Sequence, residues 1–323
     1  MKRAVVFVTW ISALGAVLGN FAVGGCQKTP ETTSAAAASS VAARPGERAA
    51  GPGQASSATT GRLSRPLLWS VAKDGKTTYF LGTMHIGIDA ETRLPASVWD
   101  KLHAATTFAM EADLDDPAVA ALIKPTERSL RRELGDEYWK KLEDAMGASV
   151  ARALDHMPPM IPAAALSMRA APQTVAMDKA LAAHAATEHK QVVFLEPASR
   201  QLAILGKWMD VKALKMMLDE LPDQDQRVRT MIDAYVAGDV DRLIAISDGE
   251  KLDALHHGYT AAEYDQEMNE MLYDRNASWI AALENLHAGG GGFVAVGALH
   301  LVGPRSVLEL MAGKGYQVTR IAP

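Results

Sequence analysis

Two histidines end similar short motifs that follow strand-like apolar segments. His85 ends Gly-Thr-Met-His after residues 77–81, and His300 ends Gly-Ala-Leu-His after residues 293–296. Each is then followed by an aliphatic residue and, within three positions, by a glycine. In open α/β folds, ligands bind beyond the carboxyl ends of the strands. The two motifs therefore predict that both imidazoles face one cleft at that edge of a sheet.

Two glutamates occupy the same kind of position. Glu111 follows the strand-like residues 106–110, and Glu196 follows residues 192–195, which we expect to form a buried strand. Imidazole nitrogens and carboxylate oxygens are ligands of zinc, manganese, cobalt and iron. A metal held by two histidines and one or two glutamates would lower the pKa of a bound water. Without a metal, the same groups would serve as general base and acid, and the residues alone leave both alternatives open.

Two further charged residues have structural as well as functional interpretations. Arg275 lies in a predicted helix beside Asp274, and most helical arginines are solvated or paired with a carboxylate. Asp178 lies at the start of a predicted helix, where a negative charge is favourable. The other histidines have no strand before them and are interpreted as surface or structural residues: His103, His156, His184, His189, His256, His257 and His287.

Several classes of function find no support in the sequence. Neither a His-Glu-x-x-His helix motif, nor Gly-x-Ser-x-Gly, nor a phosphate-binding glycine loop occurs. A single cysteine excludes an internal disulfide and a second thiol nucleophile. The chain has a net charge of −5 and no basic patch with interleaved aromatics, so we expect no nucleic-acid partner.

The first 25 residues resemble a lipoprotein signal peptide. Lys2 and Arg3 precede an apolar stretch over residues 4–23, and small residues lead to Cys26, as in a bacterial lipobox. A retained transmembrane anchor is the alternative, since about 20 apolar residues can span a bilayer. The small residues favour cleavage, and lipidation would explain the lone Cys26.

A lipid on Cys26 would attach the protein to a membrane. Gln27, rather than an acidic residue, follows it, which resembles the signal for an outer-membrane lipoprotein facing the periplasm. Residues 26–66 are mainly Ala, Ser, Thr, Gly and Pro, which predicts a disordered tether. Removal of Lys2 and Arg3 would change the net charge from −5 to −7.

Residues 67–323 are long enough for one large α/β domain, rich in helix, with a central sheet. An N-terminal hairpin is expected over residues 67–81, turning at Asp74-Gly75. The site should lie at the carboxyl ends of the strands, and the repeated motif would fit two pseudo-repeated halves. A closing strand is predicted at residues 316–319. Helices are predicted over residues 95–104, 130–146, 175–187, 199–220, 226–247, 260–287 and 304–313.

These motifs, in this order, resemble the TraB/GumN family, which is related to the animal Tiki proteins. The matching segments are residues 81–85, 110–113, 178, 193–196, 201, 274–276, 296–303 and 315–318. The resemblance covers about residues 67–321. One departure is Pro197, where the family pattern leads us to expect threonine.

The resemblance implies a fold akin to erythromycin-esterase-like and ChaN-like proteins, and a divalent-metal-dependent hydrolase or peptidase. Mn, Co or Zn would be bound by His85, His300 and Glu111 or Glu196, with the other glutamate as base. Arg275 would stabilise developing negative charge. We therefore expect an envelope-anchored enzyme acting on a peptide or protein. The alternative is a non-catalytic periplasmic protein that sequesters a peptide signal or envelope ligand in the same cleft.

Overall fold

A computed structural model describes residues 61–113 and 115–322. The predicted signal peptide, Cys26 and most of the predicted tether lie outside these residues. The fold begins before the expected boundary at residue 67, because Leu63 is buried in the core and its N–H donates to the Arg93 carbonyl at 2.7 Å. Over the described ranges, no helix is both long and apolar enough to cross a membrane.

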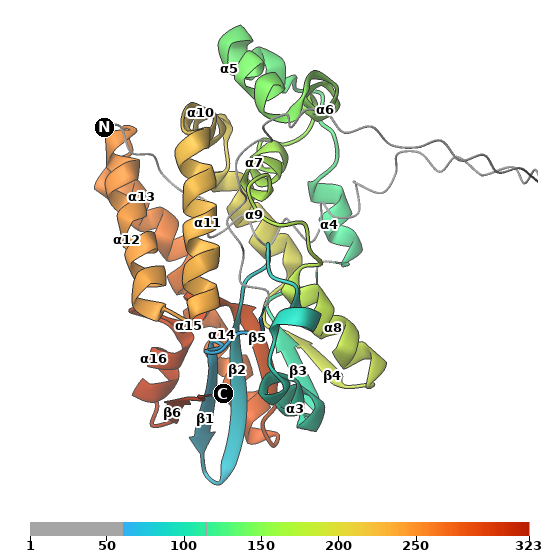
Figure 1. Ribbon diagram of the computed structural model, residues 1–323, viewed down its shortest axis with the longest axis vertical. Coiled ribbons are helices and arrows are strands. Elements are labelled where there is room, and N and C mark those ends of the chain that lie inside the picture. The colour runs from blue at the N-terminus through green and yellow to red at the C-terminus, as the bar shows by residue number, and fades with distance from the viewer. Residues whose placement is uncertain (1–60, 114, 323) are drawn as a thin grey trace, which may run out of the picture.

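The centre of the fold is a six-stranded mixed sheet in the order β4-β3-β5-β2-β1-β6 (Figure 1). The predicted hairpin is confirmed: β1 (Leu68–Lys73) and β2 (Lys76–Thr83) are antiparallel, and both turn residues, Asp74 and Gly75, have positive φ. This is the conformation that a two-residue turn between twisted strands requires. The closing strand β6 (Gln317–Arg320) pairs antiparallel with β1.

The other pairings are parallel. β2 pairs with β5 (Phe293–Gly297), β5 with β3 (Thr107–Met110), and β3 with β4 (Gln191–Phe194). The carboxyl ends of these four strands therefore meet at one edge. Within β2 and β5, Thr83 lies opposite Gly297, so the two Gly-x-x-His motifs are offset by one residue in the sheet.

β4 differs from the sequence expectation. It was expected to be a buried strand, but it lies at the edge of the sheet, and Val192 and Phe194 are 36% and 42% exposed. A continuous apolar run predicts a buried strand, but a sequence does not show whether a strand has neighbours on both sides of the sheet. Only β3 pairs with β4 among the described residues.

Helices pack on the sheet and extend beyond its carboxyl edge, where they form a second lobe (Figure 1). One hydrophobic core joins the sheet to the helices around it, and a second lies within the helical lobe. The helices are α2 (Ala90–Arg93), α3 (Ala96–Ala104), α4 (Pro117–Leu122), α5 (Leu130–Met146), α6 (Ala148–Leu154), α7 (Met160–Met168), α8 (Met177–Thr187), α9 (Ala198–Trp208), α10 (Val211–Asp219), α11 (Leu221–Ala237), α12 (Val240–His256), α13 (Ala261–Met268), η1 (Asn269–Tyr273), α14 (Asp274–Ala288), α15 (Ala298–Leu301) and α16 (Val307–Gly313).

Three long predicted helices are each interrupted. The helix predicted over 226–247 breaks at Gly238, which adopts the left-handed conformation, and Asp239 then caps α12. The helix predicted over 199–220 breaks before Asp210, which caps α10. The helix predicted over 260–287 contains the π-helical turn η1, directly before Arg275. Such turns are frequent at functional sites.

A buried glutamate in the helical lobe gives the fold a testable pH dependence. Glu267 is 5% exposed, and burial, with Asp210 nearby, raises its pKa to about 8. The folded state therefore keeps a proton on Glu267 that the unfolded chain releases near its ordinary pKa of 4.5. This contribution to stability is complete below the unfolded pKa and is lost as the pH rises through 8.

We therefore expect Glu267→Gln, which mimics the protonated form, to match the wild type at about pH 5 and to be more stable by about 2–4 kcal/mol at about pH 9. Urea denaturation at both pH values measures the difference. The exposed Glu127, changed to Gln, is the control and should show no such difference. An equal effect of Glu267→Gln at both pH values would contradict the assignment.

Candidate functional site

The structure brings the two motif histidines together at the carboxyl edge of the sheet. His85 Nε2 lies 3.8 Å, and His300 Nε2 lies 3.7 Å, from the same oxygen, Oε1 of Glu111. His300 follows β5 in the short helix α15 and is 3% exposed, while the His85 side chain is 17% exposed. His85 is thus the more accessible of the two imidazoles.

Asp178 fixes the orientation of His85. One carboxylate oxygen is bonded to His85 Nδ1, and the other accepts a hydrogen bond from the Thr83 hydroxyl at 2.7 Å. Because a carboxylate only accepts hydrogen bonds, Nδ1 must carry the proton in this contact. With Nδ1 held by Asp178, the other ring nitrogen, Nε2, faces Glu111. Asp178 does occupy the first turn of α8, as its sequence position indicated, but its carboxylate also holds a site histidine.

Asn276 fixes the orientation of His300 by a similar arrangement. Its Nδ2 donates to the carbonyl oxygen of Arg305 at 3.0 Å, and its Oδ1 lies 2.6 Å from His300 Nδ1. Because a carbonyl only accepts, the amide orientation is determined, and His300 Nδ1 must be the donor. His300 Nε2 therefore carries the lone pair, and this lone pair is on the side of Glu111 and Arg275.

Glu111 is held by a dense set of donors. Oε1 accepts from the backbone N–H of Gly297 at 2.8 Å. Oε2 accepts from Gln201 at 3.0 Å and from the Arg275 guanidinium at 2.6 Å. Gly297 is needed here for space, since an added Cβ would lie 3.2 Å from both Glu111 Oε1 and His85 Nε2. The two histidines and Glu111 thus surround a space that a side chain at position 297 would narrow.

Arg275 joins the two glutamates. Besides Glu111, it donates from Nε to Glu196 Oε1 at 2.7 Å, and another of its nitrogens donates to the Met271 carbonyl in η1. Glu196 is 5% exposed; its second oxygen has no hydrogen-bond partner among the described residues and lies 3.7 Å from Arg200 at the rim. Arg275 therefore donates hydrogen bonds that position both carboxylates. Its expected role in stabilising negative charge that develops on a substrate stays a prediction.

The protonation of the cluster follows from burial and from these charges. Burial lowers the pKa of His85, but Asp178, and less strongly Glu111, outweigh it and raise the pKa to about 9. Burial lowers the pKa of His300 to about 3 despite the attraction of Glu111. Burial raises the pKa of Glu196 above its ordinary value, whereas in Glu111 the basic neighbours outweigh burial and lower the pKa.

The cluster has more negative than positive charge. The carboxylates of Glu111, Asp178 and Glu196 are buried; the buried guanidinium of Arg275 pairs with Glu111 and Glu196, and Asp178 pairs with His85. Uncompensated buried charge is strongly unfavourable. Protons on His85 and Glu196, or a bound cation, would restore the balance. With His85 protonated, three carboxylates face two positive charges, so one negative charge is in excess while Glu196 is ionised.

The donor set has the chemistry that a divalent metal requires. The Nε2 atoms of two imidazoles and a carboxylate oxygen face one space, and each imidazole is oriented by an oxygen on its other nitrogen, as in many metal sites. Over the described part of the chain, no group of three or more His, Cys, Asp or Glu side chains is arranged so that it could hold a metal ion. The residues therefore match a metal site by donor type and by imidazole orientation, but not by their spacing in this structure.

Sequence reasoning identified His85, Glu111, Glu196, Arg275 and His300, and the structure places all five in this one cluster. It assigned no role to four residues that position the cluster, Thr83, Gln201, Asn276 and Gly297, although all four lie in the segments on which the family resemblance rests. Asn276 directly follows Arg275 and Gly297 begins the second histidine motif, so their positions carried a signal. Nothing in the sequence singled out Thr83 as a partner of Asp178.

Comparison with known proteins identifies a family for this chain. The family model described as the TraB/PrgY/gumN family matches residues 67–320, most of the chain. No curated protein and no solved structure matches the chain significantly.

Proposed function

Because the chain belongs to the TraB/PrgY/gumN family, we propose that it is a divalent-metal-dependent hydrolase that cleaves a peptide or related amide bond. The observation that supports this most directly is the convergence of two imidazole Nε2 atoms on Oε1 of Glu111, at 3.8 and 3.7 Å. The excess of buried carboxylates around them adds an electrostatic preference for a cation. Mn, Co and Zn all suit this donor set.

In this proposal, His85, His300 and Glu111 hold the metal. The metal supplies Lewis acidity, which polarises a carbonyl and lowers the pKa of water. Asp178 and Asn276 keep both Nδ1 atoms protonated, so that each Nε2 is the nitrogen that would bind the metal. For this, His85 Nε2 would lose its proton and His300 Nε2 would give up its 3.4 Å contact with Arg275 Nη1. Arg275 holds Glu111 and Glu196 at a fixed separation through charged hydrogen bonds.

Glu196 is the group best suited to accept a proton. Burial raises its pKa above the ordinary value of a glutamate, and its Oε2 makes no hydrogen bond with the described residues. A general base works best when its pKa lies near the working pH. Pro197, which follows it, begins α9 as the N-cap residue, so the glutamate is fixed between a strand and a helix.

The cellular setting is also part of the proposal. A lipid on Cys26 would hold the protein at the bacterial outer membrane, facing the periplasm, with peptides or proteins of the envelope as substrates. The sequence pattern around Cys26 supports this, and radiolabelled fatty-acid incorporation in the wild type and in Cys26→Ala tests it.

The function is tested by metal content and peptide cleavage together. We expect the purified protein to contain one divalent ion per chain and to cleave members of a peptide mixture, detected by mass spectrometry. His85→Ala and His300→Ala should lose the metal and reduce cleavage by at least about 10³-fold, because each removes one ligand. Chelation should abolish cleavage and metal addition should restore it.

His256→Ala is the matched control, since His256 is exposed on α12 and lies outside the cluster. It should keep both metal and activity. Cleavage that survives thorough chelation would refute the metal role. Peptide binding without cleavage by the metal-loaded protein would instead favour the sequestering alternative.

A further inference from the structure

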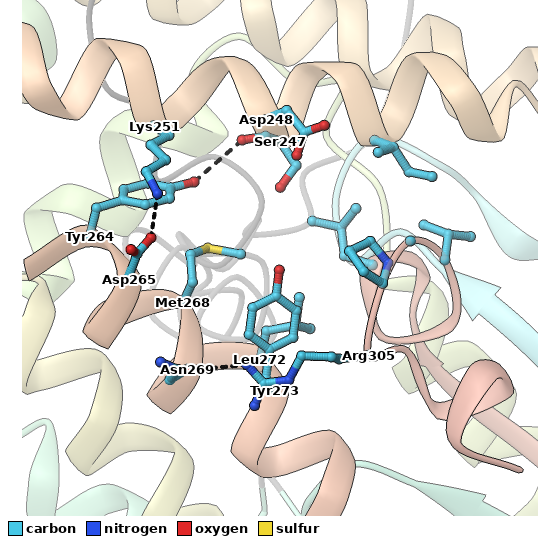
Figure 2. Close-up of a pocket in the computed structure, with 15 residues that line it drawn as sticks. Ser247, Asp248, Lys251, Tyr264, Asp265, Met268, Asn269, Leu272, Tyr273 and Arg305 are labelled. Atoms are coloured by element: carbon cyan, nitrogen blue, oxygen red, sulfur yellow. Dashed lines mark hydrogen bonds and ion pairs between the residues drawn. The ribbon is translucent and has the colours of Figure 1, made fainter. Parts of the chain in front are cut away.

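A cavity of about 580 Å³ lies behind the cluster, between α12, the helical segment α13–η1 and the loop after His300 (Figure 2). This volume is typical of a small-molecule site. Its apolar wall includes Ile244, Leu272, Leu299 and Val302. Figure 2 shows the Tyr273 hydroxyl directed into the space, with Ser247 and Asp248 on the opposite wall. The cavity is therefore amphipathic.

Two of the segments that line this cavity also carry residues of the candidate site. Leu299 and Val302 flank His300 in the chain, and Leu272 and Tyr273 lie in η1 immediately before Arg275. A ligand in the cavity would touch both segments.

The charges around the cavity favour a cationic occupant. Lys251 is paired with Asp265 at 2.5 Å, and Arg305 donates to Asn269 at 2.6 Å while its guanidinium lies over the Tyr273 ring. Asp248 has no ion-pair or hydrogen-bond partner in the part of the chain that the structure describes. Its carboxylate is therefore the charge available to a ligand. An anionic ligand would have to displace an existing partner of Lys251 or Arg305.

We propose that this cavity binds an amphipathic amine, with the ammonium group at Asp248 and the apolar chain against Leu272 and Leu299, and that its occupancy is felt at His300. The ammonium would pair with Asp248, and the Tyr273 hydroxyl, which is directed into the same space, would accept a hydrogen bond from it. The apolar chain would bury surface that is now open to water.

Two hydrogen bonds connect the cavity wall to His300. Arg305 lines the cavity, and its own carbonyl accepts from Asn276, whose other end holds His300 Nδ1. Arg305 is also one of three non-glycine residues with positive φ among the described residues, a conformation that surrounding contacts must maintain. Contact of a ligand with this loop would therefore shift the Arg305 carbonyl and the amide that depends on it.

Calorimetric titration with hexylamine tests the binding, with hexanol and hexanoate as probes of equal chain length. We expect hexylamine to bind most tightly, and Asp248→Asn to weaken it by at least about fivefold through loss of the charge pair. Asp241→Asn, an exposed aspartate on the same helix, should leave the affinity unchanged. Equal binding of hexylamine and hexanol, or an Asp248→Asn variant with wild-type affinity, would overturn the proposal.

Nuclear magnetic resonance of histidine labelled with ¹⁵N tests the coupling. Saturating hexylamine should shift the His300 ring signals, while those of His287, which is buried and bonded to Thr78 and the Lys73 carbonyl, should stay fixed. Unchanged His300 signals at saturation would overturn the coupling. Neither measurement uses hydrolysis, so a failure here is distinguishable from a failure of the proposed function.

Discussion

Replacing Arg275 by methionine will lower the free energy of unfolding by about 3–5 kcal/mol, because it leaves two buried glutamates without their shared guanidinium. Arg275 is 4% exposed and forms ion pairs with Glu111 and Glu196, each at 2.6 Å. Methionine fills much of the same volume, so the decrease in the free energy of unfolding arises mainly from the lost charge and not from a cavity. Urea denaturation followed by circular dichroism measures it.

The same variant should depend on pH in a defined direction. Burial already raises the folded-state pKa of Glu196 above its ordinary value, and loss of Arg275 raises it further. The folded variant then binds protons that the unfolded chain has released, so its stability falls as the pH rises. We expect a larger loss at about pH 8 than at about pH 5.

Arg200→Met is the matched control for this prediction. Arg200 is half-exposed at the rim, 3.7 Å from Glu196, and exposed pairs contribute about 0–1 kcal/mol. A similar loss in both variants would show that Arg275 is not the group that balances the buried carboxylates.

Gly297→Ala should impair the site while leaving the fold almost intact. Gly297 has φ −50° and ψ 138°, which alanine adopts freely, so backbone strain does not require glycine. The new methyl group would lie 3.2 Å from Glu111 Oε1 and His85 Nε2 and 3.6 Å from a His300 ring carbon. We expect at least about a tenfold loss of metal affinity and about a 100-fold loss of cleavage, since small displacements of reacting groups have such effects.

Gly249→Ala provides the comparison for this variant. It lies inside α12 with open space around its Cα, so alanine there should stabilise the helix by about 0.5–1 kcal/mol and leave metal binding unchanged. Wild-type metal affinity in Gly297→Ala would show that the space between the histidines and Glu111 is not the binding position.

The sequence by itself determined the fold class and the residues at the strand ends. The Asp74-Gly75 turn predicted the β1–β2 hairpin because so few residues tolerate positive φ, and the apolar runs before His85, Glu111, Glu196 and His300 marked the parallel strands. Since carboxyl ends of parallel strands meet at one edge, the cluster followed from local patterns alone. Family resemblance rested on these same residues, and the match over residues 67–320 confirms it.

Only the tertiary structure decided which partners hold those residues. The bond from Asp178 to His85, the bridge from Asn276 to His300 and the pairing of Arg275 with two glutamates join residues that lie far apart in the chain. The edge position of β4 and the breaks before α10 and α12 likewise depend on neighbours and caps. Local patterns report the period of a segment and its ends, whereas tautomer, charge balance and burial are set by contacts between segments, which no single stretch of sequence contains.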